Sequence, residues 1–293
     1  MRSLLFVPGD SPRKQEKALG SGADALILDL EDSVALDAKP KAREITRDFL
    51  AEMKQRADAP AIIVRVNALQ TGMTQADLDA VMPAAPFAIM LPKSEGGSDV
   101  GHLAALIAVR EAENELPDGQ TRIIPIATET GKGIFGLGSY AGSSHRLSAL
   151  TWGAEDLSAD LGAETNRLPD GSYATPYQLA RSLTLFAASA AQVDAIDTVF
   201  PQFRDAAGFR AECEAARRDG FVGKMAIHPD QVAPINEVFA PSPEELAKAE
   251  RIIALFAENP GAGVIGLDGD MLDRPHLIRA ERLKERAAKT PQR

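Results

Sequence analysis

The chain has 293 residues, a formal net charge of −10, and 45% hydrophobic and 25% charged residues. Its length is close to the ~250 residues of a (β/α)8 barrel that carries an added segment. The negative net charge argues against a nucleic-acid-binding surface, which needs a stripe of basic residues. No apolar run approaches the ~20 residues that cross a bilayer, so we expect contact with neither nucleic acid nor membrane.

The amino-terminal apolar run, residues 3–7, is too short for a secretory signal, and Pro8-Gly9 ends it. The single cysteine, Cys213, excludes an internal disulfide and fits a reducing compartment. It lies in a helical pattern without an activating neighbour, so we interpret it as an unreactive helix residue. We therefore expect a cytoplasmic protein.

Short apolar runs alternate with helical segments along most of the chain. Continuous apolar runs are typical of strands buried on both faces of a parallel sheet, and alternation with helices predicts βαβ units. Eight such strands predict a closed (β/α)8 TIM barrel. The expected strands are 3–7, 25–30, 61–66, 88–91, 122–127, 149–152, 195–200 and 224–227; helical spacing occupies 14–19, 42–55, 100–114 and 177–190.

The chain continues well beyond the eighth strand. We expect a barrel domain over residues 1–240 and a C-terminal helical extension over residues 241–293. The extension is predicted to contain a helix over 243–258 with Ser242 as its N-cap, a Gly-rich mobile loop over 259–270, and a charged helix over 276–288. A barrel does not need this extension, which could be a lid or an oligomer contact.

Polar residues follow nearly every expected strand. In a barrel the carboxyl ends of the strands build the active site, so these side chains should gather at one rim. They include Asp32 after the second strand, Arg65 in the third, Lys93 after the fourth, Glu129 after the fifth, Glu155 and Asp156 after the sixth, and His228 after the eighth.

Glu129 and Asp156 should end neighbouring strands. Two carboxylates with open positions suit Mg²⁺, and no His or Cys set has zinc spacing. Arg65 should point into the barrel mouth, where a planar cation can hold a carboxylate or a developing oxyanion. Any one acid at a strand end is more often a loop cap, and His228 could be a structural hydrogen bonder; the combination favours a site that polarises a carbonyl and stabilises an enolate.

Several stretches together are similar to one family. They run in the family's order from about residue 2 to residue 280, and they resemble the citrate lyase beta-subunit-like (CitE-like) family of the HpcH/HpaI aldolase superfamily, near the malyl-CoA and citramalyl-CoA lyases. The stretches are Leu4-Leu5-Phe6-Val7-Pro8-Gly9, Asp29-Leu30-Glu31-Asp32-Ser33-Val34, Arg65-Val66-Asn67, Pro92-Lys93, Glu129-Thr130, Gly153-Ala154-Glu155-Asp156-Leu157 and Gly223-Lys224-Met225-Ala226-Ile227-His228-Pro229.

The resemblance implies roles for residues of this chain. Glu129 and Asp156 match magnesium ligands, and Arg65 matches the arginine that binds substrate and steadies the oxyanion. Substrate or CoA contacts are expected at Phe6, Lys17, Glu155, Ile227 and His228, with Asp32 in support beside the site. The segment 269–276 resembles a C-terminal lid whose aspartate, here Asp273, acts as acid/base in a neighbouring subunit's site, which implies a homo-oligomer, a trimer or hexamer.

The expected activity is a Mg²⁺-dependent carbon–carbon lyase acting on a short 3-hydroxyacyl-CoA. The chain departs from the pattern of the family at one position that concerns the substrate. Many family members have Arg where this chain has Ser11, and Arg13 stands two residues further on. Three alternatives stay open: a malyl-CoA thioesterase on the same scaffold, a citrate lyase beta subunit acting on an acyl-carrier-protein thioester, and an oligomeric scaffold without activity.

Overall fold

The computed structural model describes residues 1–289. They fold into two compact units: Arg2–Val238 form one, and the chain from Phe239 onward forms the other, together with Met1. Among the described residues, no helix combines the length and apolar character needed to cross a membrane.

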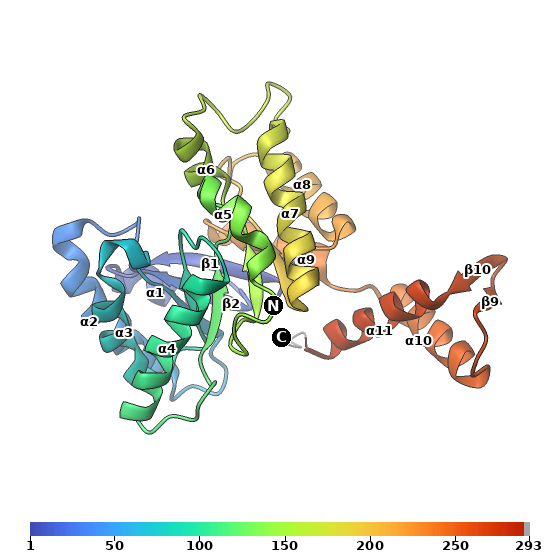
Figure 1. The fold of residues 1–293 in the computed structure, drawn as a ribbon, viewed down its shortest axis with the longest axis horizontal. Helices are drawn as coiled ribbons and strands as arrows, with labels where there is room; N and C mark the ends of the chain where they lie inside the picture. Colours follow the sequence, from blue (N-terminus) through green and yellow to red (C-terminus); the bar gives the residue numbers. More distant parts are fainter. Residues whose placement is uncertain (290–293) are drawn as a thin grey trace. The chain divides into compact units, whose positions relative to one another are not determined.

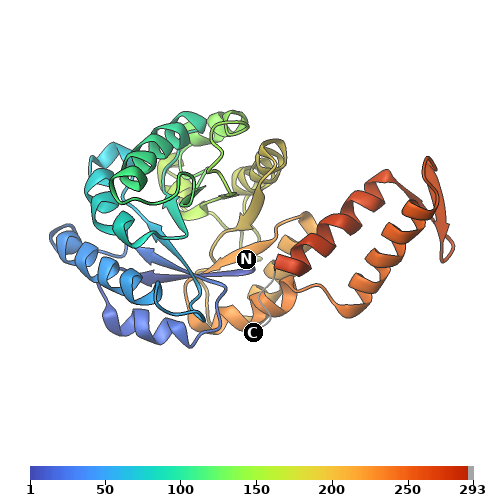
Figure 2. The ribbon, with the colours of Figure 1, turned by 90° about the horizontal axis from the view of Figure 1, so that it is seen from below.

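The first unit is built on eight parallel strands. Their order is β5-β4-β3-β2-β1-β8-β7-β6, and the bridges Ile123–Leu147 and Ile126–Thr151 join the two end strands. The sheet is thereby closed into the predicted (β/α)8 barrel (Figures 1 and 2). The strands are β1 (Ser3–Pro8), β2 (Ala25–Asp29), β3 (Ala61–Arg65), β4 (Ala88–Leu91), β5 (Arg122–Pro125), β6 (Ala149–Thr151), β7 (Asp194–Asp197) and β8 (Gly223–Ala226).

Helices surround these strands (Figure 2). The longer connections contain 3-10 turns at residues 36–38, 69–71, 82–84, 137–139 and 229–231. The helices are α1 (Pro12–Leu19), α2 (Lys39–Met53), α3 (Thr74–Val81), α4 (Gly97–Glu113), α5 (Gly131–Gly136), α6 (Ala154–Leu161), α7 (Thr175–Ala191), α8 (Ala206–Asp219) and α9 (Val232–Phe239).

Local sequence sets where the helices begin and end. Pro12 stands in the first turn of α1, where its missing N–H costs nothing. Gly162 and Gly220 end α6 and α8 with φ values of 67° and 119°, a region that glycine enters without a side-chain clash. Every residue of β2 and β4 is buried, as continuous apolar strands predict.

Strands β5 and β7 end two and three residues earlier than predicted, and β2, β3, β6 and β8 end one residue earlier. Strand β7 stops at Asp197 instead of continuing to Phe200, because Thr198 and Val199 leave the ladder to line a cavity. Cys213 is fully buried in α8, and burial raises the pKa of its thiol to about 12, which agrees with the prediction of an unreactive residue.

The second unit contains α10 (Pro243–Glu258), β9 (Val264–Leu267), β10 (Asp270–Asp273) and α11 (Arg274–Lys289). The prediction of a loop over residues 259–270 was wrong for Val264–Leu267, because β9 pairs antiparallel with β10. Asp268 and Gly269 connect the strands with φ values of 54° and 89°, as a two-residue Asp-Gly hairpin turn requires. A small core holds the unit together: Ala249, Ile252, Leu267, Leu272 and Ala280.

Candidate active site

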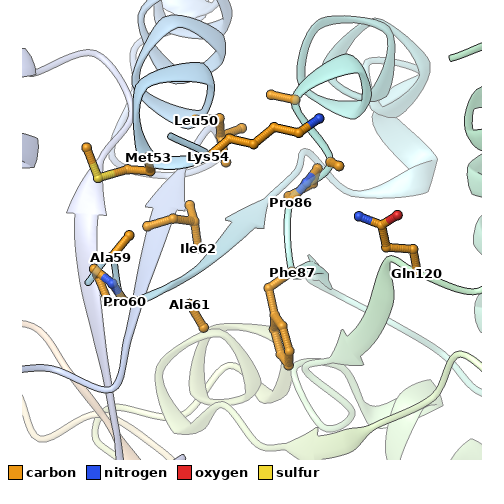
Figure 3. A pocket seen from close by; sticks show the side chains of 12 residues that line it. Leu50, Met53, Lys54, Ala59, Pro60, Ala61, Ile62, Pro86, Phe87 and Gln120 are labelled. Carbon is orange, nitrogen blue, oxygen red and sulfur yellow. The ribbon is translucent and has the colours of Figure 1, made fainter. Parts of the chain in front are cut away.

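A cavity of about 400 Å³ lies at the carboxyl ends of the barrel strands. Seven of the predicted site residues line it: Phe6, Asp32, Arg65, Glu129, Glu155, Asp156 and Ile227. A second hollow, of about 300 Å³, lies where β3 begins and is lined mainly by apolar side chains such as Met53, Ile62 and Phe87 (Figure 3). The convergence of charged groups makes the first cavity the candidate active site.

Arg65, the last residue of β3, is held by two acids, one at the end of β2 and one just after it. Its Nε and Nη2 donate to the two oxygens of Asp29 at 2.7 and 2.8 Å, and its Nη1 lies 3.0 Å from Glu31 Oε2. The guanidinium carbon also lies 5.0 Å from the centre of the Phe6 ring. The arginine fork is therefore fixed in orientation, with its position set by the strand ends rather than by a mobile loop.

Arg65 and Asp29 each stabilise the charged form of the other. Burial alone would lower the pKa of Arg65, but its hydrogen bonds to Asp29 and the charges of Asp29 and Glu31 raise that pKa above the ordinary value. Burial would likewise raise the pKa of Asp29, yet the contact with Arg65 lowers it. Arg65 is thus a permanent cation, and Asp29 a permanent anion, inside the cavity wall.

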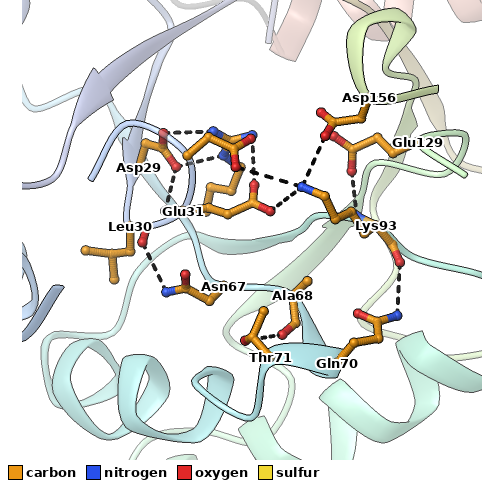
Figure 4. Close-up of polar contacts among 12 residues, drawn as sticks. Asp29, Leu30, Glu31, Asn67, Ala68, Gln70, Thr71, Lys93, Glu129 and Asp156 are labelled. Atoms are coloured by element: carbon orange, nitrogen blue, oxygen red, sulfur yellow. Dashed lines mark hydrogen bonds and ion pairs between the residues drawn. The ribbon is translucent and has the colours of Figure 1, made fainter. Parts of the chain in front are cut away.

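Lys93 connects this group to the opposite side of the cavity (Figure 4). Its Nζ lies 2.6 Å from Glu31 Oε1 and 3.3 Å from Asp156 Oδ1. Its main-chain N–H donates to Glu129 Oε2 at 2.5 Å. Lys93 has a φ of 51°, a conformation that is uncommon for a residue with a side chain, and this bend presents both its N–H and its ammonium group to the carboxylates.

Glu129 is buried beneath the cavity, with 3% of its surface exposed. Burial, followed by the negative charge of Asp156, raises the pKa of Glu129 to about 8, against the opposing effect of the Lys93 N–H. Gly153, which precedes α6, leaves room for this side chain, because a Cβ at position 153 would lie 2.7 Å from Glu129 Cγ. Asp156 stands in the first turn of α6.

The pair of Glu129 and Asp156 has the chemistry of a magnesium site. The two acidic side chains face one cavity (Figure 4). Burial and, after it, the charge of Asp156 raise the pKa of Glu129, and a cation between the two carboxylates would offset both effects. Within residues 1–289 there is no group of three or more His, Cys, Asp or Glu placed to hold a metal. Two protein carboxylates would leave several positions for water and substrate oxygens, as Mg²⁺ commonly keeps.

Three predicted residues do not line this cavity. Lys17 is exposed on α1. His228 caps the turn at residues 229–231 by accepting a hydrogen bond from the Asp230 N–H, and its ring stacks on Phe203 with centroids 4.7 Å apart. These contacts fit the alternative in which His228 is a structural hydrogen bonder. Asp273 belongs to the second unit, where its Oδ1 lies 2.5 Å from His276 Nδ1.

Asp29, Glu31 and Lys93 are structurally central residues that are placed on the rim by the sequence but have no role in the site predicted from it. Each one follows or ends a strand on the same rim as Arg65. That position is the signal in the sequence, because the carboxyl ends of the strands build the active site of a barrel. Glu155, by contrast, was assigned and lines the cavity, where its Oε1 accepts from Asn166 Nδ2 at 2.8 Å.

Comparison with known proteins adds independent findings. A family model described as HpcH/HpaI aldolase/citrate lyase matches residues 2–229. A citrate lyase beta subunit from Leuconostoc mesenteroides subsp. cremoris is 35% identical over 288 residues, which cover 98% of this chain and 93% of that protein. A (3S)-malyl-CoA thioesterase from Cereibacter sphaeroides is 38% identical over 292 residues, which cover 98% and 94%.

Solved structures resemble the whole chain as well. The CitE protein of Mycobacterium tuberculosis in complex with magnesium, acetoacetate and coenzyme A matches with a TM-score of 0.77 and 34% identity, covering 98% of both chains. The same protein in complex with magnesium and pyruvate matches with a TM-score of 0.72 and 30% identity, covering 97% of both. Sequence and structure comparisons thus agree on the same group of proteins.

Proposed function

We propose that this chain, which belongs to the HpcH/HpaI aldolase/citrate lyase family, is a magnesium-dependent carbon–carbon lyase. The substrate is a short 3-hydroxyacyl thioester of coenzyme A, of the malyl-CoA or citramalyl-CoA type, and the products are a 2-oxo acid and an acyl-CoA. One observation carries the proposal: the buried cation Arg65 and the carboxylates Glu129 and Asp156 line the same cavity at the strand ends.

Glu129 and Asp156 are the residues that would hold Mg²⁺. The bound ion supplies Lewis-acid polarisation of substrate oxygens. The solved relatives that contain magnesium together with acetoacetate or pyruvate support this assignment. The chain's own contribution is to keep Glu129 in place from two sides, through the Lys93 N–H and through the space that Gly153 leaves.

Arg65 stabilises the negative charge that appears on the substrate as the carbon–carbon bond breaks. A guanidinium has five N–H donors, and three of its contacts in this chain, through Nε, Nη2 and Nη1, go to Asp29 and Glu31. Nη1 also lies 3.6 Å from Asp32 Oδ2, so the second N–H on Nη2 is the donor left for an oxyanion in the cavity. Because the cation is already oriented by buried acids, it needs no reorganisation during the reaction.

The substrate hydroxyl must lose its proton as the carbonyl of the 2-oxo acid forms, and the thioester enolate that leaves must take up a proton, so one acid/base group can carry the proton from the first to the second. The family resemblance assigns this acid/base role to Asp273, supplied by the second unit of a neighbouring copy in a trimer or hexamer. Within its own unit Asp273 is half exposed and paired with His276, whose hydrogen bond lowers the pKa of Asp273. A carboxylate that is accessible and oriented by a neighbour is suited to exchange a proton.

A second candidate function is thioester hydrolysis, which the 38% identity to (3S)-malyl-CoA thioesterases favours. A third is the role of a citrate lyase beta subunit that acts on a carrier-protein thioester, which the similarity to such subunits favours. All three use the same cavity, and they differ in the bond that breaks or in the group that carries the acyl chain.

Product analysis separates the three candidates. The purified chain is incubated with malyl-CoA and with citramalyl-CoA in the presence of Mg²⁺, and 2-oxo acid and free thiol are measured in parallel. Lyase activity gives glyoxylate or pyruvate without free thiol. Malate with an equal amount of free thiol would instead support hydrolysis, and inactivity on both CoA esters combined with turnover of a carrier-protein thioester would support the subunit role.

A further inference from the structure

A buried network of charges lies behind one wall of the candidate cavity. Lys224 of β8 is completely buried, and its Nζ contacts Asp197 Oδ2 at 2.7 Å and Glu212 Oε1 at 2.8 Å. Asp197 and Lys224 are register partners on adjacent strands, and Glu212 reaches them from α8. Neither the proposed reaction nor the magnesium site uses these charges.

The network reaches the cavity through Trp152. The indole Nε1–H donates to Asp197 Oδ1 at 2.8 Å, and Trp152 lines the cavity. On its other side, the Tyr173 ring packs edge-on against the indole, with centroids 5.0 Å apart and planes at 67°. The indole is therefore held both by a hydrogen bond and by an aromatic contact.

Arg167 joins the two supports of the indole. Its Nη2 lies 2.9 Å from Glu212 Oε2, and its guanidinium carbon lies 3.9 Å from the centre of the Tyr173 ring. The contacts thus form a closed ring of residues, which we call the circuit, in which each residue contacts the next and the last contacts the first. In order, its members are Trp152, Asp197, Lys224, Glu212, Arg167 and Tyr173.

Two members of the circuit lie on the segment of residues 162–174 between α6 and α7, the extended connection at the top of Figure 1. The same segment carries Asn166, whose Nδ2 donates to Glu155, a second residue of the cavity lining. The segment is thus tied to the cavity wall at two points, through Tyr173 to Trp152 and through Asn166 to Glu155.

We propose that the closed circuit is a positioning device, which fixes the Trp152 wall and the segment 162–174 and so sets how tightly the cavity holds its ligand. A buried ion pair adds little stability over apolar residues of the same volume, but it defines one arrangement, because displacing either partner leaves a buried charge unpaired. Asp197, Lys224, Glu212 and Arg167 are positioning residues, and they act on the cavity through Trp152, which is fully buried in its wall.

Trp152 is the only tryptophan of the chain, so its fluorescence reports on this wall directly. The test variant is Glu212→Gln, which removes one charge from the middle of the circuit with little change in shape. The matched control is Glu214→Gln on the same helix, where the exposed Glu214 pairs with Arg210 at 3.1 Å. Acrylamide quenching of Trp152 is measured in the ligand-free proteins, whose folding is checked by circular dichroism.

The expected result is a quenching constant about twofold higher in Glu212→Gln than in wild type, because the unpaired charges admit water and loosen the indole; Glu214→Gln should match wild type. Equal quenching constants in folded Glu212→Gln and folded Glu214→Gln would overturn the proposal. If Glu212→Gln gives no folded protein, Arg167→Lys, which keeps the charge but loses the planar group over Tyr173, is measured in its place with the same two outcomes.

A kinetic measurement completes the test, and it alone rests on the proposed function. A looser wall weakens binding of the substrate ground state and of the transition state by the same factor. KM should therefore rise about 10-fold in Glu212→Gln while kcat stays within about twofold. In a Trp152→Phe background the same substitution should change KM much less. A loss confined to kcat would contradict a positioning role. If no thioester is turned over, the proposed function fails, and the quenching measurement still decides on the circuit.

Discussion

Asp29 and Arg65 are register partners at the ends of two adjacent parallel strands, and the carboxylate of Asp29 accepts hydrogen bonds from both Nε and Nη2 of Arg65. This pairing places a permanent cation at the rim of the cavity without the help of a loop. The proposed chemistry depends on it, because an oxyanion stabiliser is effective only if it is oriented before the reaction begins.

Replacing Arg65 by Lys should lower kcat by about 10²-fold or more, because an ammonium keeps the charge but loses the planar fork that Asp29 and Glu31 orient. Steady-state release of 2-oxo acid measures the effect. Arg43→Lys is the matched control, since Arg43 makes a similar contact with Asp77 at 2.7 Å but does not line the cavity. Comparable losses of kcat in both variants would contradict the assigned role.

Replacing Asp29 by Asn should reduce kcat about 10- to 100-fold, because one amide N–H would face an arginine N–H and misplace the cation. The substitution should also lower the midpoint of urea unfolding, since Arg65 loses its main buried partner. Arg43→Met removes the cationic partner of another buried acid, Asp77, and should lower stability while kcat per folded enzyme stays near wild type. An Asp29→Asn enzyme with unchanged kcat would show that the pairing is structural only.

Replacing Gly153 by Ala should weaken Mg²⁺ binding about 10- to 100-fold, the usual effect of disturbing a group that positions a metal ligand. The physical cause is the new Cβ, which would lie 2.7 Å from Glu129 Cγ and force that side chain to move. Calorimetric titration with MgCl₂ measures the affinity. Gly138→Ala is the control, because nothing lies within 4 Å of the Cβ added there; equal affinities in the two variants would count against the assigned position of Glu129.

Replacing Asp156 by Asn should lower Mg²⁺ affinity by at least about 10-fold, because one of two anionic oxygen donors is lost. The same substitution at Asp194, an exposed residue at the first position of β7 and hence at the opposite end of the strands, should leave the affinity unchanged. Calorimetry on both variants distinguishes a ligand from a general effect of net charge. Unchanged binding in Asp156→Asn would remove this residue from the metal site.

The stability of the barrel should depend on pH through a pair at its amino-terminal end. Arg2 donates to the buried carboxylate of Asp24 from its main-chain N, its Nε and its Nη2, at 2.7 to 3.0 Å. Burial alone would raise the pKa of Asp24, but these contacts lower it below 3.8. A lowered folded-state pKa contributes stability that is present above the unfolded value and is lost as pH falls through the folded value.

Replacing Arg2 by Met should therefore cost about 3 kcal/mol of unfolding free energy at pH 7, because the buried Asp24 loses its cationic partner and keeps only the main-chain N–H of residue 2. The cost should shrink as the pH falls and Asp24 becomes protonated. Urea unfolding between neutral and acidic pH measures the difference. Arg47→Met, which removes the exposed pair with Asp48, should have little effect at any pH, and a cost for Arg2→Met that does not change with pH would contradict the role of Asp24.

Most of the barrel could be predicted from the sequence, because strands buried on both faces leave uninterrupted apolar runs such as those of β2 and β4. The antiparallel hairpin of the second unit could not be predicted from apolar periodicity. In β9 only Leu267 is buried, and the informative feature is the Asp268-Gly269 turn, which a Gly-rich composition conceals. The β9–β10 hairpin is predicted by the type of its turn and not by its hydrophobic pattern.

For the site, the sequence indicated which side chains share a rim but not which of them pair. Arg65, Glu129 and Asp156 follow or end strands, so their approach follows from the parallel arrangement. The partners of Arg65 depend on strand register, which sets Asp29 beside it, and register is a tertiary property. The contacts of Lys93 depend on its positive φ, which nothing in the residue type predicts.

The most direct test of the central claim is the release of 2-oxo acid from malyl-CoA and citramalyl-CoA as a function of Mg²⁺ concentration, with free thiol measured in the same samples. The expected result for a Mg²⁺-dependent lyase is a saturable rise in glyoxylate or pyruvate with Mg²⁺, no equivalent release of thiol, and loss of activity after chelation that added Mg²⁺ restores. Release of 2-oxo acid at an unchanged rate in excess chelator, or release of thiol alone, would contradict it.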